Sequence, residues 1–402
     1  MKTRILSSLL ILCSMQLSAQ KKFAQLDQEL PTPNEYHAAS GAPGYHYYQQ
    51  KADYKMNLVI DDATQKLSGF ETITYTNNSP DRLDYLWLQL DQNIYDENSE
   101  TKLIEVEKME DFKSMGDIRK RDFKYDGGFK IEQITNTSGQ KMSYFINKTM
   151  LRIDLEKPLM PNTSITFQVK WWYNINDRMQ VGGRSGYEYF EKDQNYLYTI
   201  AQFFPRMCVY NDVTGWQNKQ FLGRGEFTLP FGDYEVNITV PADHVVAATG
   251  ECQNYASILT ADQKKRLEQA RKSDVPVIIV TQAEAEKAEA DKAKKTKTWT
   301  YKATNVRDFA FATSRKFIWD AQNMPVNGKN VLCMSYYPKE GNPLWERYST
   351  KLVAHTIKTY SKYTVDYPYP VAISVHSKWI GMEYPMICFN GGRPEADGTY
   401  TE

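Results

Sequence analysis

One strand and the turn after it are visible in Phe231-Gly-Asp-Tyr-Glu-Val-Asn-Ile-Thr-Val-Pro-Ala-Asp-His-Val-Val-Ala-Ala-Thr-Gly250. Apolar and polar residues alternate from Tyr234 to Val240, and Pro241 ends the run. A period of two places one face of a strand on a core and the other toward water. This stretch therefore predicts a half-buried β-strand.

The same alternation recurs in the segments that precede this stretch. Turn signals such as Asn77-Asn78-Ser79-Pro80 separate these segments. Many short strands with turns between them predict a β-sandwich or a large, open, twisted sheet up to about Tyr255. The predicted strands are Lys66–Asn77, Leu83–Leu90, Leu151–Leu155 and Ile165–Tyr173.

The composition changes at about residue 257, where a helical insertion is expected to run to about residue 298. Thr260-Ala-Asp-Gln263 resembles a capping box, which opens a helix, and this helix is predicted through Lys272. The run Val275–Val280 is short and apolar, which is typical of a buried or edge strand.

A second capping box, Thr281-Gln-Ala-Glu284, is followed by Ala/Glu/Lys-rich sequence to Lys297. Asp291 and Lys295 are predicted to pair across four residues of this helix. A stretch so rich in charge could serve as a linker or an interaction arm, but it is more typical of a solvated surface helix.

A longer helix is predicted from Leu344 to Tyr363. Its apolar residues have the spacing of one helix face that packs inward. Tyr367-Pro-Tyr-Pro370 ends the helix and begins an extended segment. The given sequence stops at Glu402 in a Gly-rich polar loop. The apolar residues of the predicted face are Trp345, Tyr348, Leu352, Ile357 and Tyr360.

The composition indicates a globular chain of two or three domains. Of the 402 residues 41% are hydrophobic, and 49 Lys and Arg balance 49 Asp and Glu. This balance favours neither nucleic acid nor an acidic membrane surface as a partner. The sequence does not indicate an oligomeric state.

The N-terminus has the layout of a secretory signal peptide spanning residues 1–19. A basic start is followed by the mostly apolar run Ile5–Met15 and by the small residue Ala19. That run is too short to span a bilayer, and no later stretch is long enough. We therefore expect a secreted or periplasmic protein without a membrane span, in which residues 20–47 form a polar lead.

Four cysteines remain after cleavage, and they lack the spacing of a metal-binding motif. An oxidising compartment permits disulfides, but four cysteines allow three pairings. Buried free thiols are an equally acceptable interpretation. The cysteines concerned are Cys208, Cys252, Cys333 and Cys388.

The sequence contains no complete active site of a known kind. None of its five histidines forms a His-Glu-x-x-His pair, and it has no Gly-x-Ser-x-Gly elbow. His355 and His376 are the histidines closest to the C-terminal motif, and each is more typical of a surface or core position than of a ligand. We therefore predict no catalytic residue and no metal ligand within the given sequence.

The segment Trp379-Ile-Gly-Met-Glu-Tyr-Pro-Met-Ile-Cys-Phe-Asn390 is apolar except for Glu383. A carboxylate in such a setting is costly to desolvate unless a cation or donor meets it. A substrate ammonium group is one such partner, and a structural salt bridge is the other. Gly381 would allow a second backbone to approach an edge strand closely.

This segment resembles the Gly-x-Met-Glu-Asn exopeptidase motif of the gluzincin zinc aminopeptidases, the family of aminopeptidase N and leukotriene hydrolase. Four other stretches resemble that family in the same order, so the likeness covers roughly residues 48–402. These stretches are Gly69–Asn77, Phe231–Gly250, Asn305–Phe311, and Tyr360–Tyr363 with Asp366–Pro370.

The resemblance implies a mainly β, saddle-like sandwich domain over residues 48–302. The first part of an α+β, thermolysin-like metallopeptidase domain would follow over residues 303–402. Glu383 matches the glutamate that binds the free α-amino group of the substrate, and Gln202 looks like the glutamine of the first-residue pocket. Ile380, Gly381 and Met382 would form the strand along which the substrate lies.

The sequence departs from the family motif at two positions. Ile380 stands where the motif has its first glycine, which narrows backbone access and puts the preferred substrate in doubt. Tyr384 stands where the motif has asparagine, and this change leaves the amine-binding glutamate intact.

Zinc is the cofactor that the family implies, and its ligands are expected beyond residue 402. The resemblance therefore implies the N-terminal portion of a secreted zinc aminopeptidase with a peptide substrate, inactive on its own. The alternative is a non-catalytic protein that binds peptides or partners. A His-Glu-x-x-His encoded shortly after codon 402 would favour the first interpretation.

Overall fold

The computed structural model describes residues 33–395, except 100, 102–114, 116–124, 224, 226 and 379, together with 397 and 399. The predicted signal peptide and the first part of the polar lead lie outside the described residues, as does Trp379 of the predicted motif.

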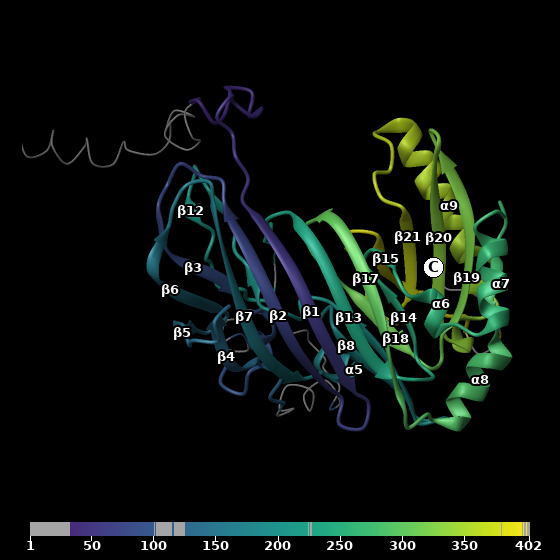
Figure 1. Cartoon of the computed structure of the whole chain (residues 1–402). Helices are drawn as coiled ribbons and strands as arrows, with labels where there is room; N and C mark the ends of the chain where they lie inside the picture. Colours follow the sequence, from purple (N-terminus) through teal and green to yellow (C-terminus); the bar gives the residue numbers. More distant parts are fainter. Residues whose placement is uncertain are drawn as a thin grey trace, which may run out of the picture.

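A seven-stranded sheet forms the middle of the molecule, in the order β15-β17-β13-β1-β2-β7-β4 (Figure 1). Buried and half-buried residues alternate along the whole of β2, as the period of two predicted. β1 and β13 run parallel, and the other pairs are antiparallel. The bounds are β1 Lys51–Asp61, β2 Lys66–Asn77, β4 Lys130–Asn136, β7 Thr163–Asn174, β13 Gly232–Pro241, β15 Glu251–Cys252 and β17 Thr296–Val306.

Three smaller sheets surround the seven-stranded one. Their orders are β10-β3-β6-β5, β14-β18-β9-β8 and β11-β12. The bounds are β3 Leu83–Gln89, β5 Ser143–Asn147, β6 Met150–Leu159, β8 Gly186–Phe190, β9 Asn195–Ile200, β10 Arg206–Met207, β11 Tyr210–Asn211, β12 Gly215–Trp216, β14 Val245–Ala248 and β18 Phe311–Ser314.

A six-stranded sheet follows, in the order β16-β19-β20-β21-β23-β22. Its first strand, β16, comes from the predicted helical insertion and pairs with β19. The insertion therefore supplies part of this second sheet. The bounds are β16 Val277–Val280, β19 Ile318–Val326, β20 Lys329–Tyr337, β21 Val371–His376, β22 Met382–Tyr384 and β23 Ile387–Asn390.

The described helices are few, and the longer ones lie beside the six-stranded sheet (Figure 1). Not one of these described helices is long and apolar enough to cross a membrane. The bounds are η1 Asp91–Tyr95, α5 Arg178–Val181, α6 Tyr255–Ile258, α7 Ala261–Ala270, α8 Gln282–Asp291, η2 Lys339–Gly341 and α9 Leu344–Tyr363.

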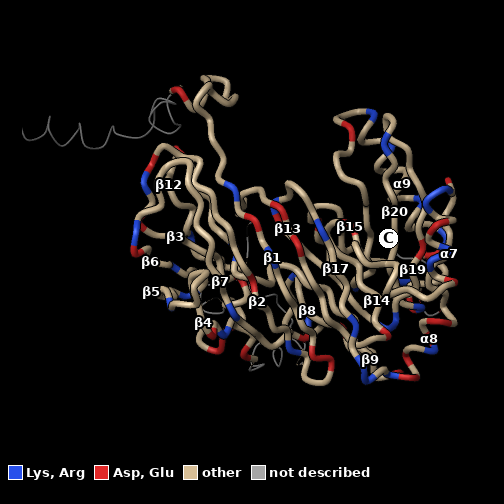
Figure 2. The backbone as a smooth tube through the Cα atoms, in the orientation of Figure 1, with Lys and Arg blue, Asp and Glu red and all other residues tan. Residues whose placement is uncertain are grey.

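Both predicted capping boxes are confirmed, at Thr260 for α7 and at Thr281 for α8. Blue and red segments are interspersed along the two helices, as expected for charged, solvated surfaces (Figure 2). The predicted pair of Asp291 with Lys295 is wrong, because the left-handed Lys292 ends α8 and Asp291 pairs with Lys287 instead.

Helix α9 has the predicted bounds, but the prediction that its whole apolar face packs inward is wrong. Trp345 and Ile357 are buried, whereas the exposed fractions of Tyr348, Leu352 and Tyr360 are 48%, 59% and 67%. The helix contacts β19, β20 and β21, and part of its apolar surface remains exposed.

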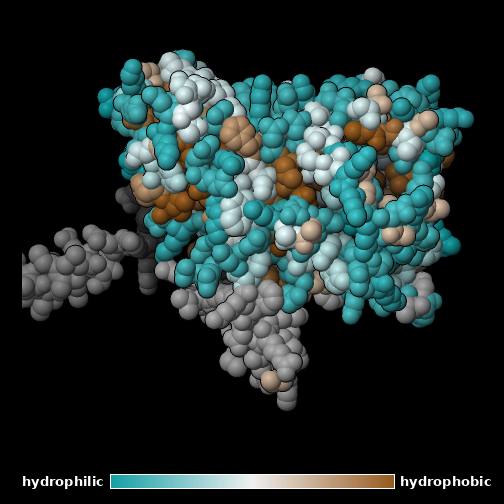
Figure 3. Space-filling model, turned by 60° about the horizontal axis from the view of Figure 1, so that its bottom comes forward, coloured by the Kyte–Doolittle hydropathy of each residue, from teal (hydrophilic) through white to brown (hydrophobic). Residues whose placement is uncertain are grey.

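One continuous hydrophobic core joins the sheets, and three tryptophans, Trp171, Trp299 and Trp319, are fully buried in it. Seen from below, the surface is mostly hydrophilic and apolar residues show as separate patches (Figure 3). The predicted fold class is confirmed: a mainly β region of several sheets precedes an α+β unit. The predicted boundary at residues 302 and 303 falls inside β17 and stays a prediction.

Candidate functional site

A polar pocket of about 340 Å³ lies where the β region meets the last strands of the six-stranded sheet. We call it the Glu383 pocket. It collects residues from η1, β10, β22 and the connections between strands. Among the residues that line it are Asp91, Gln202, Arg206, Asp308, Glu383 and Tyr384.

Glu383 stands in the middle of the short strand β22, opposite Cys388 of β23. β22 is the last strand of its sheet, so one of its edges pairs with no described strand. Glu383 is exposed at this edge, between the buried Met382 and the half-buried Tyr384. An open edge can accept an extended peptide through main-chain hydrogen bonds.

Gln202 reaches the same pocket from the segment after β9, although 181 positions separate it from Glu383 in the sequence. Its φ of 52° lies in the left-handed region, which non-glycine residues seldom adopt. The side chain of Gln92 donates a hydrogen bond of 3.1 Å to the Gln202 carbonyl oxygen. This contact helps to hold the unusual backbone in place.

Arg206 forms the buried floor of the pocket with two carboxylates. Its Nη2 donates to Oδ2 of Asp91 at 2.7 Å, and its Nη1 donates to Asp308. Nη1 also lies 3.5 Å from the hydroxyl oxygen of Tyr384 on β22. The Arg206 side chain therefore ties the first sheets to the strand that carries Glu383.

The electrostatic interactions in the pocket floor favour the charged form of Arg206 between Asp91 and Asp308. Burial acts to lower the pKa of Arg206, but Asp308 and Asp91 outweigh burial and hold that pKa well above its usual value. Burial raises the pKa of Asp308, and Arg206 opposes that shift. Burial, aided by Asp308, also raises the pKa of the Tyr384 hydroxyl well above its usual value.

The other predicted substrate-binding residues do not line the pocket. Ile380 is buried in the core and precedes β22, so only Met382 of the predicted stretch Ile380–Met382 belongs to the strand. Gly381 is exposed, and a Cβ added there would meet no described atom within 4 Å. The space beside Gly381 is therefore open to a second backbone.

The two histidines nearest the motif make ordinary contacts. His355 is exposed on α9, with its Nε2 3.3 Å from the Thr359 hydroxyl. His376 is buried and accepts a hydrogen bond of 3.2 Å from Nε of Arg393 at its Nε2. Burial, with the nearby Arg393 and Arg178, holds the pKa of His376 well below its usual value, so its ring is neutral.

Within the part of the chain that the structure describes, no group of three or more His, Cys, Asp or Glu residues could hold a metal ion. The described residues thus do not fit a zinc site. The four cysteines after the signal region are free thiols, which agrees with one of the two interpretations of the sequence. Burial raises the pKa of Cys252 to about 11, so it is protonated at neutral pH.

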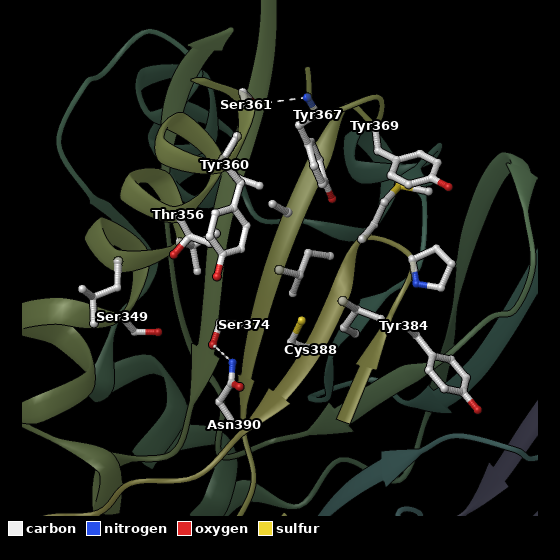
Figure 4. A pocket seen from close by; sticks show the side chains of 18 of the residues that line it. Ser349, Thr356, Tyr360, Ser361, Tyr367, Tyr369, Ser374, Tyr384, Cys388 and Asn390 are labelled. Carbon is white, nitrogen blue, oxygen red and sulfur yellow. Dashed lines mark hydrogen bonds between the residues drawn. The ribbon is translucent and has the colours of Figure 1, made fainter. Parts of the chain in front are cut away.

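A second cavity of about 810 Å³ lies between α9 and the strands β21 and β23 (Figure 4). We call it the apolar groove. Tyr360 of α9 and Tyr367 stand along it, and Asn390 donates a hydrogen bond of 2.8 Å to Ser374 at its base. It shares Tyr369, Tyr384 and Pro385 with the Glu383 pocket.

Sequence patterns did not mark Asp91, Arg206 and Asp308 as site residues. Arg206 follows Gln202 closely, and Asp308 lies inside the segment Asn305–Phe311 that carries part of the family resemblance. For Asp91 and Arg206, a single charge in an otherwise apolar segment was the available signal, whereas Asp308 directly follows Arg307. Their pairing depends on contacts between distant parts of the chain.

The sequence matches no known family profile and no curated protein. Its fold, however, resembles that of solved M1 zinc metallopeptidases. One, from Deinococcus radiodurans, is 12% identical with a TM-score of 0.50, and the match covers 87% of this chain and 62% of that one. A glutamate-to-alanine mutant of the M1 zinc metallopeptidase from this organism matches with the same identity and coverage and a TM-score of 0.48.

A third structure, a mutant of the Deinococcus radiodurans M1 zinc metallopeptidase bound to a Tyr-Ser-Ala substrate, is 12% identical with a TM-score of 0.47. The match covers 86% of this chain and 61% of that one. The chain thus spans about three fifths of the length of these enzymes. At this identity the likeness shows the fold.

Proposed function

We propose that this chain is the peptide-binding portion of a zinc metallopeptidase of the aminopeptidase type. The observation that carries the proposal is the Glu383 pocket. An exposed carboxylate on an open strand edge and Gln202 from a distant segment line this same cavity. Glu383 binds the α-ammonium group of a peptide, and the free edge of β22 binds the peptide backbone. The fold shared with M1 zinc metallopeptidases supports this proposal.

Zinc enters the proposal through the likeness to zinc metallopeptidases. Because the described residues do not fit a metal site, the chemistry derived for this chain is binding and orientation of the substrate. Zinc in such enzymes activates a water molecule for attack on the peptide carbonyl. In this chain, the buried ion pairs of Arg206 with Asp91 and Asp308 fix the floor on which the substrate rests.

Calorimetric titration of the purified chain with Ala-Ala-Ala-amide, and with the same peptide acetylated at its N-terminus, tests the proposal. We expect acetylation to weaken binding by about 1.5–3 kcal/mol, because it removes a charge-assisted hydrogen bond. Glu383→Gln should weaken binding of the free peptide similarly and leave the acetylated peptide unaffected.

Glu268→Gln is the matched control, since Glu268 is an exposed glutamate of α7. It should bind both peptides as the unchanged chain does. Equal affinity of the unchanged chain for free and acetylated peptide would refute the role of Glu383, and so would an unaltered Glu383→Gln variant.

We also propose that the protein is secreted or periplasmic, after cleavage behind Ala19. The basic and apolar pattern of the first 19 residues supports this location. Mass spectrometry of the protein from the extracytoplasmic fraction should give an N-terminus at Gln20. Recovery of the protein in the cytoplasm with residues 1–19 intact would contradict the proposal.

A further inference from the structure

Arginine side chains stand beside the carboxylate in the Glu383 pocket. Besides the paired Arg206, the pocket is lined by Arg307, from the segment after β17, and by Arg184. Arg307 is exposed, and among the described residues no carboxylate lies within ion-pair distance of it. Its guanidinium lies 4.3 Å from the ring centre of Phe231 and donates from Nη1 to the hydroxyl of Thr228.

These contacts hold the Arg307 guanidinium in place and leave most of its N–H donors available to a ligand. A guanidinium has five N–H donors, and one of them bonds Thr228. Stacking on Phe231 sets the plane of the group, which limits the entropy lost when a ligand binds. Planar guanidinium groups bind carboxylates through two parallel hydrogen bonds.

The pocket therefore offers opposite charges to one small ligand. Glu383 projects from β22 and Arg307 from the segment before β18, and both line a cavity of about 340 Å³. This volume lies near the lower end of ligand pockets, which begin at about 300 Å³. Such a space fits one amino-acid residue that carries both an ammonium and a carboxylate group.

We propose that the Glu383 pocket selects peptides whose first residue is acidic, with Arg307 binding the side-chain carboxylate while Glu383 binds the α-ammonium group. This inference rests on the proposed function. The carboxylate could also be the C-terminus of a very short peptide. The small volume shared by Glu383 and Arg307 favours the side chain of the first residue, because that carboxylate lies closest to the ammonium group.

Calorimetric titration of the full 402-residue chain with four peptides tests the inference. Glu-Ala-Ala-amide and Gln-Ala-Ala-amide differ only in the side-chain charge, while Ala-Ala-Ala-amide and Ala-Ala-Ala with a free C-terminus differ only in the terminal charge. We expect the glutamate peptide to bind about fivefold to tenfold more tightly than the glutamine peptide. The two alanine peptides should bind equally.

Variants of Arg307 connect the preference to this side chain. Arg307→Gln should abolish the advantage of the glutamate peptide over the glutamine peptide. Arg307→Lys should retain part of the advantage, because it keeps the charge without the planar fork. Arg82→Gln, a change at an exposed arginine paired with Asp84, should keep the full advantage.

The outcomes separate this inference from the proposed function. Suppose that binding depends on Glu383 but that the glutamate and glutamine peptides bind equally well. This result would overturn the inference and leave the proposed function standing. A preference for the glutamate peptide that persists in Arg307→Gln would do the same. A preference for the free C-terminus would also overturn it, by assigning Arg307 to the other carboxylate. If no peptide binds, or if Glu383→Gln changes nothing, the proposed function and the inference both fall.

Discussion

Two cavities adjoin at Tyr384 and Pro385, and they differ in their lining. The Glu383 pocket is polar, and the other cavity is the apolar groove. In the Glu383 pocket the buried charges have partners within the chain, as the contacts of Arg206 show. In the apolar groove Tyr348, Leu352 and Tyr360 of α9 are exposed, whereas Trp345 and Ile357, which also line it, are buried. Exposed apolar surface of this extent is typical of interaction sites and also promotes aggregation.

The difference shows which parts of the chain are fixed by contacts within it. The pocket floor is held by ion pairs that join three separate segments, so its geometry does not depend on a further partner. The exposed apolar side chains of α9 contribute little to stability, because water still reaches them. Substitutions in the pocket floor and substitutions of these exposed side chains should therefore differ strongly in their effect on the free energy of unfolding.

Replacement of Arg206 by methionine should have the largest effect. The change leaves Asp91 and Asp308 buried without their cation, and we expect a loss of about 3–5 kcal/mol in the free energy of unfolding. Urea denaturation followed by circular dichroism measures this loss. The exposed pair of Arg82 with Asp84 provides the control, since Arg82→Met should cost about 0–1 kcal/mol.

A second replacement concerns a buried residue of α9 that also lines the apolar groove. Ile357 is buried against β20 and β21, in a cluster that contains Cys333 and Ala372. Ile357→Ala should cost about 2–4 kcal/mol through lost burial and the cavity that remains. The same denaturation measurement checks it, and a loss below about 1 kcal/mol would show that α9 is held less firmly than its contacts imply.

Local features of the fold were predictable from the sequence. The bounds of β2 and α9 match the predicted Lys66–Asn77 and Leu344–Tyr363, because alternation and helical periodicity act over a few residues. Both capping boxes were also local signals. The end of α8 was missed, because the left-handed conformation of Lys292 has no distinct mark in an Ala/Glu/Lys-rich sequence.

The candidate site was predictable only in part. Glu383 and Gln202 were singled out by family resemblance, and the structure places them in one pocket, while their roles stay predictions. The bonds of Arg206 to Asp91 and Asp308 span 115 and 102 positions, which no local pattern encodes. The extent of the buried side of α9 also depended on distant strands, so periodicity alone predicted burial for Tyr348, Leu352 and Tyr360, which are exposed.

A third prediction concerns a buried carboxyl group that lacks the pairing seen at Arg206. Glu71 of β2 is fully buried between Met56 and Val169 of the neighbouring strands, and neither of its carboxyl oxygens has a hydrogen-bond partner among the described residues. Burial raises its pKa well above the usual value, so the folded state holds a proton that the unfolded state releases.

The stability of the unchanged chain should therefore fall as the pH rises above the usual glutamate value of about 4.5, by up to about 1.4 kcal/mol per pH unit until the folded-state pKa is reached. Glu71→Gln should reduce this slope by up to about 1.4 kcal/mol per pH unit, while the buried Asp320, whose pKa burial raises to about 7, keeps a slope of its own. Denaturation curves between pH 5 and about pH 8 measure it. Glu132→Gln, at an exposed glutamate paired with Lys170, should keep the full slope, and an unreduced slope in Glu71→Gln would contradict the prediction.

The smallest effect on stability is expected in the apolar groove. Leu352 is 59% exposed on α9, so Leu352→Lys should change the free energy of unfolding by less than about 0.5 kcal/mol. The added charge should nevertheless reduce self-association in sedimentation and lower the fluorescence of a dye that binds apolar surfaces. Lys358→Gln, on the same helix outside the groove, should alter neither reading. If Leu352→Lys cost as much as Ile357→Ala, the side chain of Leu352 would be packed in solution, and the contrast between the pocket floor and the exposed side chains of α9 would disappear.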